Sequence, residues 1–466
     1  MPTLKITLKQ HTPLIHFQHT QEGATLRASE VKPKLDRFIL TKLGKDYEKF
    51  SNDEKQACQD YLKLLQAKNP QKTELTVYEK GFARSKQRGW LVGKGEHGAL
   101  DYKMRIFFSN NNIEYVIAST PRPFQRINNI PSNIKLLFDV PFFAQEKSTY
   151  GEENNDKRTV IYYETKTNND GKKEKDKHYF DEESWNKIEK KGILHKGLIT
   201  IIVHCMDEEL EKRLSEYMEP FFIVTNFGTR QSKGFGTFTI ESMKVNDTPQ
   251  EVKKDYLDQL KKNYKYVYSK KSTNFENAFS EIKKDYQLLK AGINFHDYTK
   301  SLLYCFCERS KIGVWEKRTI KNEMTKNGIT PYSKPLYKRN PDNSCAKCST
   351  ANSISNDKFI RALLGLAEHY EFNNSKVQVK IDGGENFERF KSPITFKIID
   401  NTIYLLGNPI NENIFSHFFS FQIYENGKCK GNPFTLSTPI NFSLEDFLEY
   451  CMIKSGKFNY IKEYSI

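Results

Sequence analysis

The sequence predicts an α+β protein of two domains, each a ferredoxin-like (RRM-like) βαββαβ unit with insertions. The chain has 466 residues, more than one compact core usually holds. Both halves mix segments of alternating apolar and polar residues, typical of strands, with segments of helical periodicity. A helix start signal follows residue 246. We therefore expect a first domain at 1–245 and a second at 246–466.

The N-terminal segment is expected to form a strand and then a helix. Residues 4–8 alternate apolar and polar side chains, which predicts the strand. In the helix that follows, Ser29 is the predicted N-cap and Gly44 the predicted C-cap. Pro33 falls early enough in that helix for its missing N–H to break no hydrogen bond.

The middle of the first domain combines strands with one very polar segment. Residues 102–108 and 113–118 are expected to form a hairpin, because the asparagines between them favour a turn. Residues 154–191 are nearly all charged or polar, which predicts a solvated insertion. An apolar strand is expected at 197–205 and an amphipathic helix at 207–218.

The stretch "PFFIVTNFGTRQSKGFGTFTI" predicts a strand, a cationic loop and a second strand. Strand, helix, strand, loop, strand is the ending of a ferredoxin-like unit. Glycines can take positive φ and let a phosphate or sugar approach the backbone, while the polar side chains supply charge and hydrogen bonds. The candidate RNA-binding residues here are Arg230, Gln231, Ser232, Lys233, Gly234 and Gly236. The alternative is a glycine-rich hairpin whose charges face water.

The second half predicts a similar α+β pattern. Thr248 and Glu251 match a capping box, so a helix is expected to begin there and helical segments to continue to about Lys290. The other expected elements are a strand or helix at 297–307, a helix at 356–370, two strands within 392–406 and a helix capped by Ser443.

Composition favours a polyanionic partner. The formal net charge is +15, and the chain has 33 Phe and 25 Tyr residues, so cations for phosphates and rings for bases are both abundant. The alternative is a lysine-rich surface that serves solubility. No P-loop and no strand-GxGxxG-helix occurs, so no nucleotide cofactor is expected. No signal peptide or long apolar stretch occurs, so we expect a cytoplasmic protein with no membrane partner.

The stretch "FFIVTNFGTRQSKGFGTFTI" resembles the glycine-rich loop of the RAMP superfamily, the RNA-binding subunits of CRISPR effector complexes. "LKITLKQHTPL" with "LRASEVKPKLDRFI" is similar to the first strand and helix of one branch, and "FIRALLGLAEHY" with "RFKSPITFKI" is similar to its second half. Together and in this order, these segments resemble the first-subunit family of the type III-B Cmr complex.

The resemblance implies two ferredoxin-like domains and an RNA-binding subunit that is not an enzyme. It would hold the 3′ part of the guide RNA (crRNA), contact the 5′ end of the target RNA and bind other Cmr subunits, especially the backbone subunit. Besides the loop, the implied RNA-facing positions are Arg27, Lys32, Lys34 and Arg37 near the first helix, with Arg389 and Lys391 in the second half. The last two can instead pair with neighbouring acids.

The sequence also contains candidate residues for a catalytic histidine site and for a zinc site. His11, His16 and His19 lie close together, and a histidine acting as general acid or base would make the chain a stand-alone, metal-independent endoribonuclease that processes guide RNA. Packing and hydrogen bonding are the commoner roles for such histidines. Cys305, Cys307, Cys345 and Cys348 have spacings that could hold a structural zinc, but Cys-x-Cys in an apolar segment more simply indicates burial, so no metal is assigned.

Overall fold

The computed structural model describes residues 3–15, 25–93, 98–108, 113–119, 134–138, 162–167, 173–178, 191–295, 297–331, 357–367, 369–372, 376–384, 390–454 and 458–463. The fold mixes helices with several sheets, most of them antiparallel. The described residues form two compact units. The first unit extends to Leu260 and includes Ile398–Asp400, and the second comprises Lys261–Lys397 and Asn401–Ile466.

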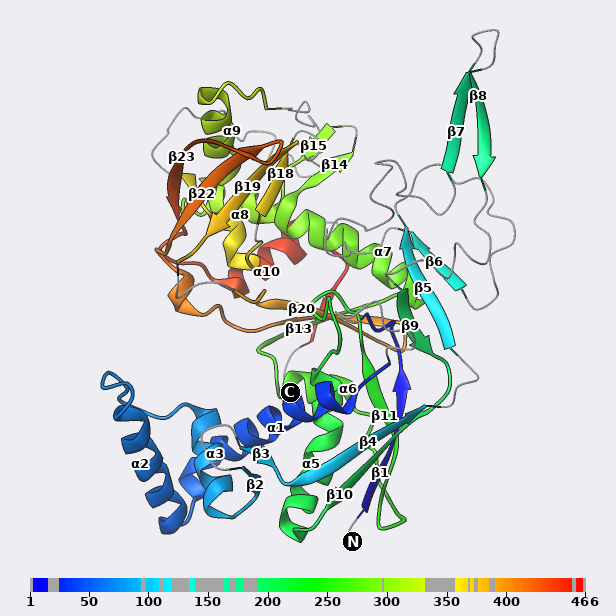
Figure 1. The fold of residues 1–466 in the computed structure, drawn as a ribbon, viewed down its shortest axis with the longest axis vertical. Helices are drawn as coiled ribbons and strands as arrows, with labels where there is room; N and C mark the ends of the chain where they lie inside the picture. The colour runs from blue at the N-terminus through cyan, green and yellow to red at the C-terminus, as the bar shows by residue number, and fades with distance from the viewer. Residues whose placement is uncertain are drawn as a thin grey trace. The chain divides into compact units, whose positions relative to one another are not determined.

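The first unit is built on a five-stranded antiparallel sheet in the order β12-β11-β1-β10-β4. Figure 1 shows α1 and α5 lying on the same side of this sheet. The apolar residues of β1 and β10 alternate with polar ones and pack in one core with residues of both helices. These elements are β1 Thr3–Gln10, α1 Ala28–Lys45, β4 Tyr102–Phe108, β10 Ile199–Cys205, α5 Glu208–Val224, β11 Phe238–Val245 and β12 Thr248–Gln250.

Helix α1 differs from the expected helix at both ends. It begins after Arg27, whose side chain makes no capping hydrogen bond, so Ser29 is not the N-cap. It also continues past Gly44 to Lys45. Gly44 lies where α1 crosses α3: a Cβ there would meet the carbonyl oxygen of Val77 at 1.8 Å. On α3, a Cβ at Gly81 would meet the carbonyl oxygen of Leu40 at 1.9 Å. Glycine is therefore needed for close helix packing and not for a helix end.

The strand expected at 220–228 is wrong. Asp207 caps α5 by accepting from the backbone N–H of Leu210 at 2.8 Å, and the helix continues through Pro220 to Val224. Phe221, Phe222 and Ile223 of the apolar segment are fully buried. A short apolar segment buried on all sides has the same composition in a helix as in a central strand, so periodicity could not separate the two.

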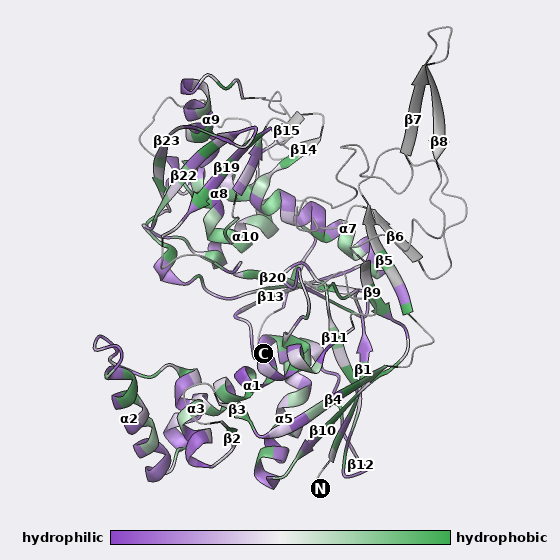
Figure 2. Ribbon diagram, in the orientation of Figure 1, coloured by the Kyte–Doolittle hydropathy of each residue, from purple (hydrophilic) through white to green (hydrophobic). Residues whose placement is uncertain are grey.

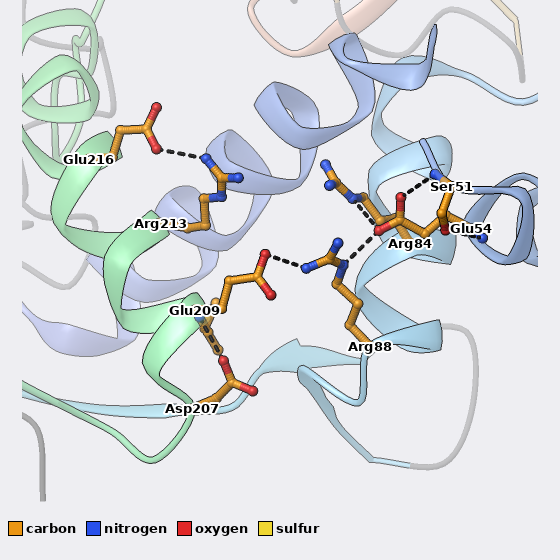
Figure 3. Close-up of polar contacts among 9 residues, drawn as sticks. Ser51, Glu54, Arg84, Arg88, Asp207, Glu209, Arg213 and Glu216 are labelled. Atoms are coloured by element: carbon orange, nitrogen blue, oxygen red, sulfur yellow. Dashed lines mark hydrogen bonds and ion pairs between the residues drawn. The ribbon is translucent and has the colours of Figure 1, made fainter. Parts of the chain in front are cut away.

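Helices α2 (Asn52–Gln66) and α3 (Val77–Gln87) extend the first unit around a small core that includes Phe50 and Cys58. Figure 2 shows hydrophilic and hydrophobic residues alternating around both helices. Glu54 is 2% exposed and accepts hydrogen bonds from the Nε atoms of Arg84 at 2.9 Å and Arg88 at 2.6 Å (Figure 3). Arg88 also pairs with Glu209 on α5.

The same carboxylate of Glu54 completes a capping box with Ser51 at the start of α2. Burial would raise the pKa of Glu54, but the hydrogen bonds from Arg84, Ser51 and Arg88 outweigh it and lower the pKa below its ordinary value. One buried carboxylate thus links α2, α3 and, through Arg88, α5.

The hairpin expected from 102–108 and 113–118 is also wrong. Both strands exist, but β4 pairs with β10, whereas β5 (Ile113–Ser119) pairs with β6 and β9 in another sheet. Within the expected insertion 154–191, β7 (Tyr162–Thr167) and β8 (Lys173–His178) form an antiparallel pair. The remaining elements here are η1 Tyr47–Lys49, β2 Leu91–Val92, β3 Ala99–Leu100, β6 Ile134–Phe138, β9 Lys191–His195 and α6 Tyr256–Lys261.

The helix expected to begin at Thr248 is wrong, because Thr248–Gln250 forms β12, paired with β11. Asn246 and Asp247 take φ of 48° and 64° and turn the chain back on itself. Pro249 is tolerated because β12 is the edge strand of the sheet. The first unit thus extends past residue 245, and the domain division at 245/246 stays a prediction.

The second unit contains the sheet β20-β21-β13-β24, except for the last two residues of β20, and a separate antiparallel sheet β18-β19-β22-β23. The expected helix at 356–370 is largely wrong: its described part forms two short strands and one turn of 3-10 helix. The strands within 392–406 are confirmed, and Ser443 accepts from the N–H of Asp446 at 3.1 Å at the start of α10.

The elements of the second unit are β13 Tyr266–Lys271, α7 Phe275–Tyr286, η2 Gln287–Ala291, β14 Ile293–Phe295, β15 Asp297–Thr299, α8 Leu302–Arg309, β16 Val314–Trp315, α9 Glu316–Lys326, β17 Asp357–Lys358, η4 Ile360–Leu364, β18 His369–Phe372, β19 Val377–Asp382, β20 Ile394–Ile399, β21 Thr402–Gly407, η5 Glu412–Ile414, β22 Phe418–Glu425, β23 Lys428–Ser437, α10 Leu444–Lys454 and β24 Ile461–Lys462.

Replacing Lys397 by methionine is expected to change how the free energy of unfolding depends on pH above neutral. Lys397 on β20 is 1% exposed, and burial holds the pKa of its ammonium group well below the ordinary value. The unfolded chain keeps this proton up to about pH 10, so the wild type gains stability relative to the variant as pH rises from neutral. Urea unfolding at about pH 7 and about pH 9.5 checks this. A difference in stability between variant and wild type that is equal at both pH values would contradict it.

Candidate nucleic-acid interface

The glycine-rich loop joins α5 to β11 and is held by backbone hydrogen bonds on two sides. Within the loop, the N–H of Phe227 donates to the carbonyl of Gly236 at 2.9 Å. Towards the segment after β1, the N–H of Gly236 donates to Pro13 at 2.9 Å and that of Thr229 to Ile15 at 2.6 Å. The loop is therefore an ordered part of the first unit.

The three glycines of the loop all take positive φ: 73° at Gly228, 88° at Gly234 and 67° at Gly236. A Cβ at Gly236 would meet the carbonyl oxygen of Phe227 at 1.9 Å, and one at Gly228 would meet that of Ile15 at 2.3 Å. At these two positions glycine allows close approach of the chain's own backbone. Arg230 also lies in the left-handed region, with φ of 59°.

The polar side chains of the loop differ in exposure. Lys233 is 7% exposed, and its N–H closes a turn by donating to the carbonyl of Arg230 at 2.8 Å. The side-chain amide of Gln231 donates to the carbonyl of Gly228 at 2.7 Å, so it stabilises the loop itself. Arg230, Gln231 and Ser232 are half-buried. The cationic part of the loop therefore presents Arg230 more openly than Lys233.

An ion pair within α1 holds the backbone of the loop through hydrogen bonds. Glu30 accepts from the backbone N–H of Gly228 at 2.7 Å and from the Nζ of Lys34 at 2.8 Å. The same Nζ donates to the carbonyl of Asn226 at 3.3 Å and lies 4.9 Å from the ring centroid of Phe227. Lys34 thus lies at the loop, and its ammonium group is engaged in holding it.

The other candidates near α1 lie apart from this contact. The Nζ of Lys32 donates to the carbonyl of Leu100 at 2.7 Å, pairs with Asp36 at 3.1 Å and lies 3.7 Å from the ring centroid of Tyr102. Burial raises the pKa of Asp36, and the positive charge of Lys32 opposes this effect. Lys32 thus anchors α1 near β4. Arg27 is half-buried at the N-cap.

Arg37 is the exposed member of the predicted cluster. Its guanidinium carbon lies 5.7 Å from the ring centroid of Tyr78 on α3. The sequence did not single out Glu30, Asn226 or Phe227 as parts of the site. The spacing of Glu30 and Lys34 was the available signal, because residues four apart on a helix face each other.

Two protein-family models match this chain, one for each part of it. The model of the Cmr1 N-terminal domain matches residues 1–293, and the model of the Cmr1 C-terminal domain matches residues 298–461. The chain belongs to the Cmr1 family. It is therefore a subunit of the type III-B CRISPR (Cmr) complex, as the sequence resemblance predicted. A search of curated proteins found no match.

Of the three histidines considered as catalytic candidates, His11 lies among the described residues of this Cmr1-family chain. The Nε2 of His11 lies 2.7 Å from the hydroxyl of Thr239, so His11 makes a structural hydrogen bond between β1's end and β11. His16 and His19 lie outside the described residues. The endoribonuclease alternative therefore rests on residues of which the structure gives no description.

Only some of the cysteine candidates and of the RNA-binding candidates in the second half lie among the described residues. Cys305 and Cys307 are buried in α8, and burial raises the pKa of the Cys307 thiol. Cys345, Cys348 and Arg389 lie outside the described residues, whereas Lys391 is exposed just before β20. Across the described ranges, no three His, Cys, Asp or Glu side chains could together hold a metal ion. Within those ranges, too, no helix is long and apolar enough to cross a membrane.

Proposed function

We propose that this Cmr1-family chain is an RNA-binding subunit of its complex and not an enzyme. It holds the 3′ part of the guide RNA and contacts the 5′ end of the target RNA, in antiviral defence in the cytoplasm. Its partners are these two RNAs and the other Cmr subunits, especially the backbone subunit. Sequence specificity then comes from pairing between guide and target, because backbone contacts do not distinguish bases.

The ordered cationic loop is the observation that carries this proposal. Its backbone is fixed by Pro13, Ile15 and Glu30, so the half-buried Arg230 is presented from a rigid support. Rigid presentation lowers the entropy lost when a phosphate or sugar is bound. The chain's formal net charge of +15 acts in the same direction over longer range.

We further propose that both units are ferredoxin-like. In the first unit, the order along the chain is β1, α1, β4, β10, α5, β11, and the order in the sheet is β11-β1-β10-β4. In the second, β13, α7, β20, β21, α10 and β24 follow each other with insertions, and the sheet order is β24-β13-β21-β20. The two orders correspond strand for strand, which supports one βαββαβ plan used twice.

The double variant Arg230→Ala/Lys233→Ala is expected to weaken binding of single-stranded RNA and to flatten its salt dependence. Each lost phosphate contact removes about 0.7 from the slope of log K against log salt. Fluorescence anisotropy over a salt series measures both effects. The matched control is Lys86→Ala/Lys212→Ala, which removes two exposed lysines from α3 and α5. A slope equal to that of the control would remove the loop from the interface.

The non-enzymatic part of the proposal is tested with end-labelled RNA that carries a CRISPR repeat-derived tag, without added metal. A native gel reports binding, and a denaturing gel of the same reaction reports cutting. We expect a shifted but intact RNA. A discrete cut that is abolished by His16→Ala or His19→Ala would instead make the chain a processing endoribonuclease.

A further inference from the structure

Among the described residues, helices α1 and α5 pack against one face of the five-stranded sheet of the first unit and leave the other face uncovered. The side chains of Leu4, Ile6 and Leu8 are buried in the core with α1 and α5, while Lys5 between them is exposed. Because alternate residues of a strand point to opposite faces, Lys5 lies on the face away from the two helices. We call this side the open face.

The strand register places a row of cations across the open face. Lys5 lies opposite Lys244 of β11 on one side and opposite Ile202 of β10 on the other, and Ile202 lies opposite Arg105 of β4. Residues opposite each other in an antiparallel sheet share a face. The side chains of Lys244, Lys5 and Arg105 are all exposed. The row spans roughly 14 Å, because neighbouring strands are about 4.8 Å apart.

Aromatic and hydroxyl side chains lie beside this row. Phe107 of β4 is 48% exposed, and its row continues through Thr200 to Thr7. On the other side of the cationic row, the exposed Lys103 lies opposite His204. An exposed ring next to cations is the arrangement with which sheets hold single-stranded nucleic acid: the ring stacks on a base while the cations contact phosphates.

The acid nearest this row along β11 does not neutralise it. Glu241 forms an ion pair with Lys254, with 2.9 Å between Nζ and Oε1. The hydrogen bond that Lys254 donates to Glu241 raises the pKa of Lys254 above its ordinary value. The four cations of the open face therefore favour an anionic occupant.

We propose that the open face binds single-stranded RNA through Lys5, Lys103, Arg105 and Lys244, with Phe107 stacking on a base. The inference rests on the proposed function, because it gives the RNA a second surface besides the loop. Charge complementarity and the exposed ring together select this occupant, since an acidic protein surface would need no stacking partner.

The test measures binding of the full chain and its variants to a labelled single-stranded 20-mer RNA, by anisotropy over a salt series. The triple variant Lys5→Gln/Arg105→Gln/Lys244→Gln is expected to bind more weakly and to lower the salt slope by about 2, or about 0.7 for each cation. Phe107→Ala is expected to weaken binding about tenfold, and Phe107→Tyr to restore it. Melting curves verify that each variant is folded.

The matched control is Lys45→Gln/Lys86→Gln/Lys212→Gln, which removes the same charge from exposed positions on α1, α3 and α5. A triple variant whose slope equals that of this control would overturn the open-face site, as would Phe107→Ala with unchanged affinity. In both cases the proposed function survives if Arg230→Ala/Lys233→Ala still weakens binding. A wild type that binds no RNA would overturn both.

Discussion

Replacing Gly81 by alanine is expected to lower the free energy of unfolding by about 3 kcal/mol. In most helices the same change stabilises, because alanine has the higher helix propensity. Here the added methyl group would lie 1.9 Å from the carbonyl oxygen of Leu40 and 2.8 Å from its carbonyl carbon. Both are backbone atoms, so no side chain can rotate away, and α1 and α3 must separate.

Urea unfolding followed by circular dichroism measures this effect. Gly89→Ala is the matched control, because Gly89 has φ of 73° but nothing within 4 Å of an added Cβ. It should lose only the strain of the left-handed conformation, about 1–2 kcal/mol. Gly44→Ala should resemble Gly81→Ala, and the two together should cost less than their sum, because they open the same crossing. A stabilised Gly81→Ala would show that the helices cross less closely.

Glu54→Gln is expected to destabilise the chain by about 3–5 kcal/mol, the usual range when one member of a buried ion pair is removed. The amide keeps the size of the carboxylate but leaves the guanidinium of Arg84, 11% exposed as a side chain, without its anion. Arg88 still has Glu209. We therefore expect Glu54→Gln to weaken mainly the packing of α2 against α3.

The pH dependence identifies the carboxylate as the cause. The pKa of Glu54 is lower in the folded chain than its ordinary value. Its stabilisation is therefore complete above about pH 4.3 and is lost as pH falls through the folded pKa. The difference between wild type and Glu54→Gln should shrink in acid. Asp60→Asn, at an exposed ion pair with Lys63, should change stability by less than about 1 kcal/mol. A pH-independent difference would point to packing and not to charge.

Alternation predicted the strands well and predicted their partners poorly. Residues 4–8 and 392–406 alternate apolar and polar side chains, residues 197–205 form an apolar segment, and all three contain strands in the structure. Partner choice depends on contacts between distant residues, so β4 was assigned to β5 although it pairs with β10. At Thr248 the capping pattern was present, but the left-handed turn at 246–247 returned the chain to β11.

The sequence named the candidate residues of the site but did not predict their arrangement in space. The glycines and cations of the loop were evident from the sequence alone. That Lys34 would hold the loop while Lys32 would bind the carbonyl of Leu100 depends on the three-dimensional path of α1. The open face was missed because Lys5, Arg105 and Lys244 are far apart in sequence and meet only through strand register.

The left-handed conformation of Arg230 has a consequence for engineering this protein. A φ of 59° suits glycine, and an arginine there carries strain of about 1–2 kcal/mol. A search for thermostable variants would therefore favour glycine at this position, among the most direct gains in the first unit. It would discard the guanidinium that the loop presents. Stability and the proposed RNA binding are thus opposed at a single residue, so selection for one should be accompanied by an assay for the other.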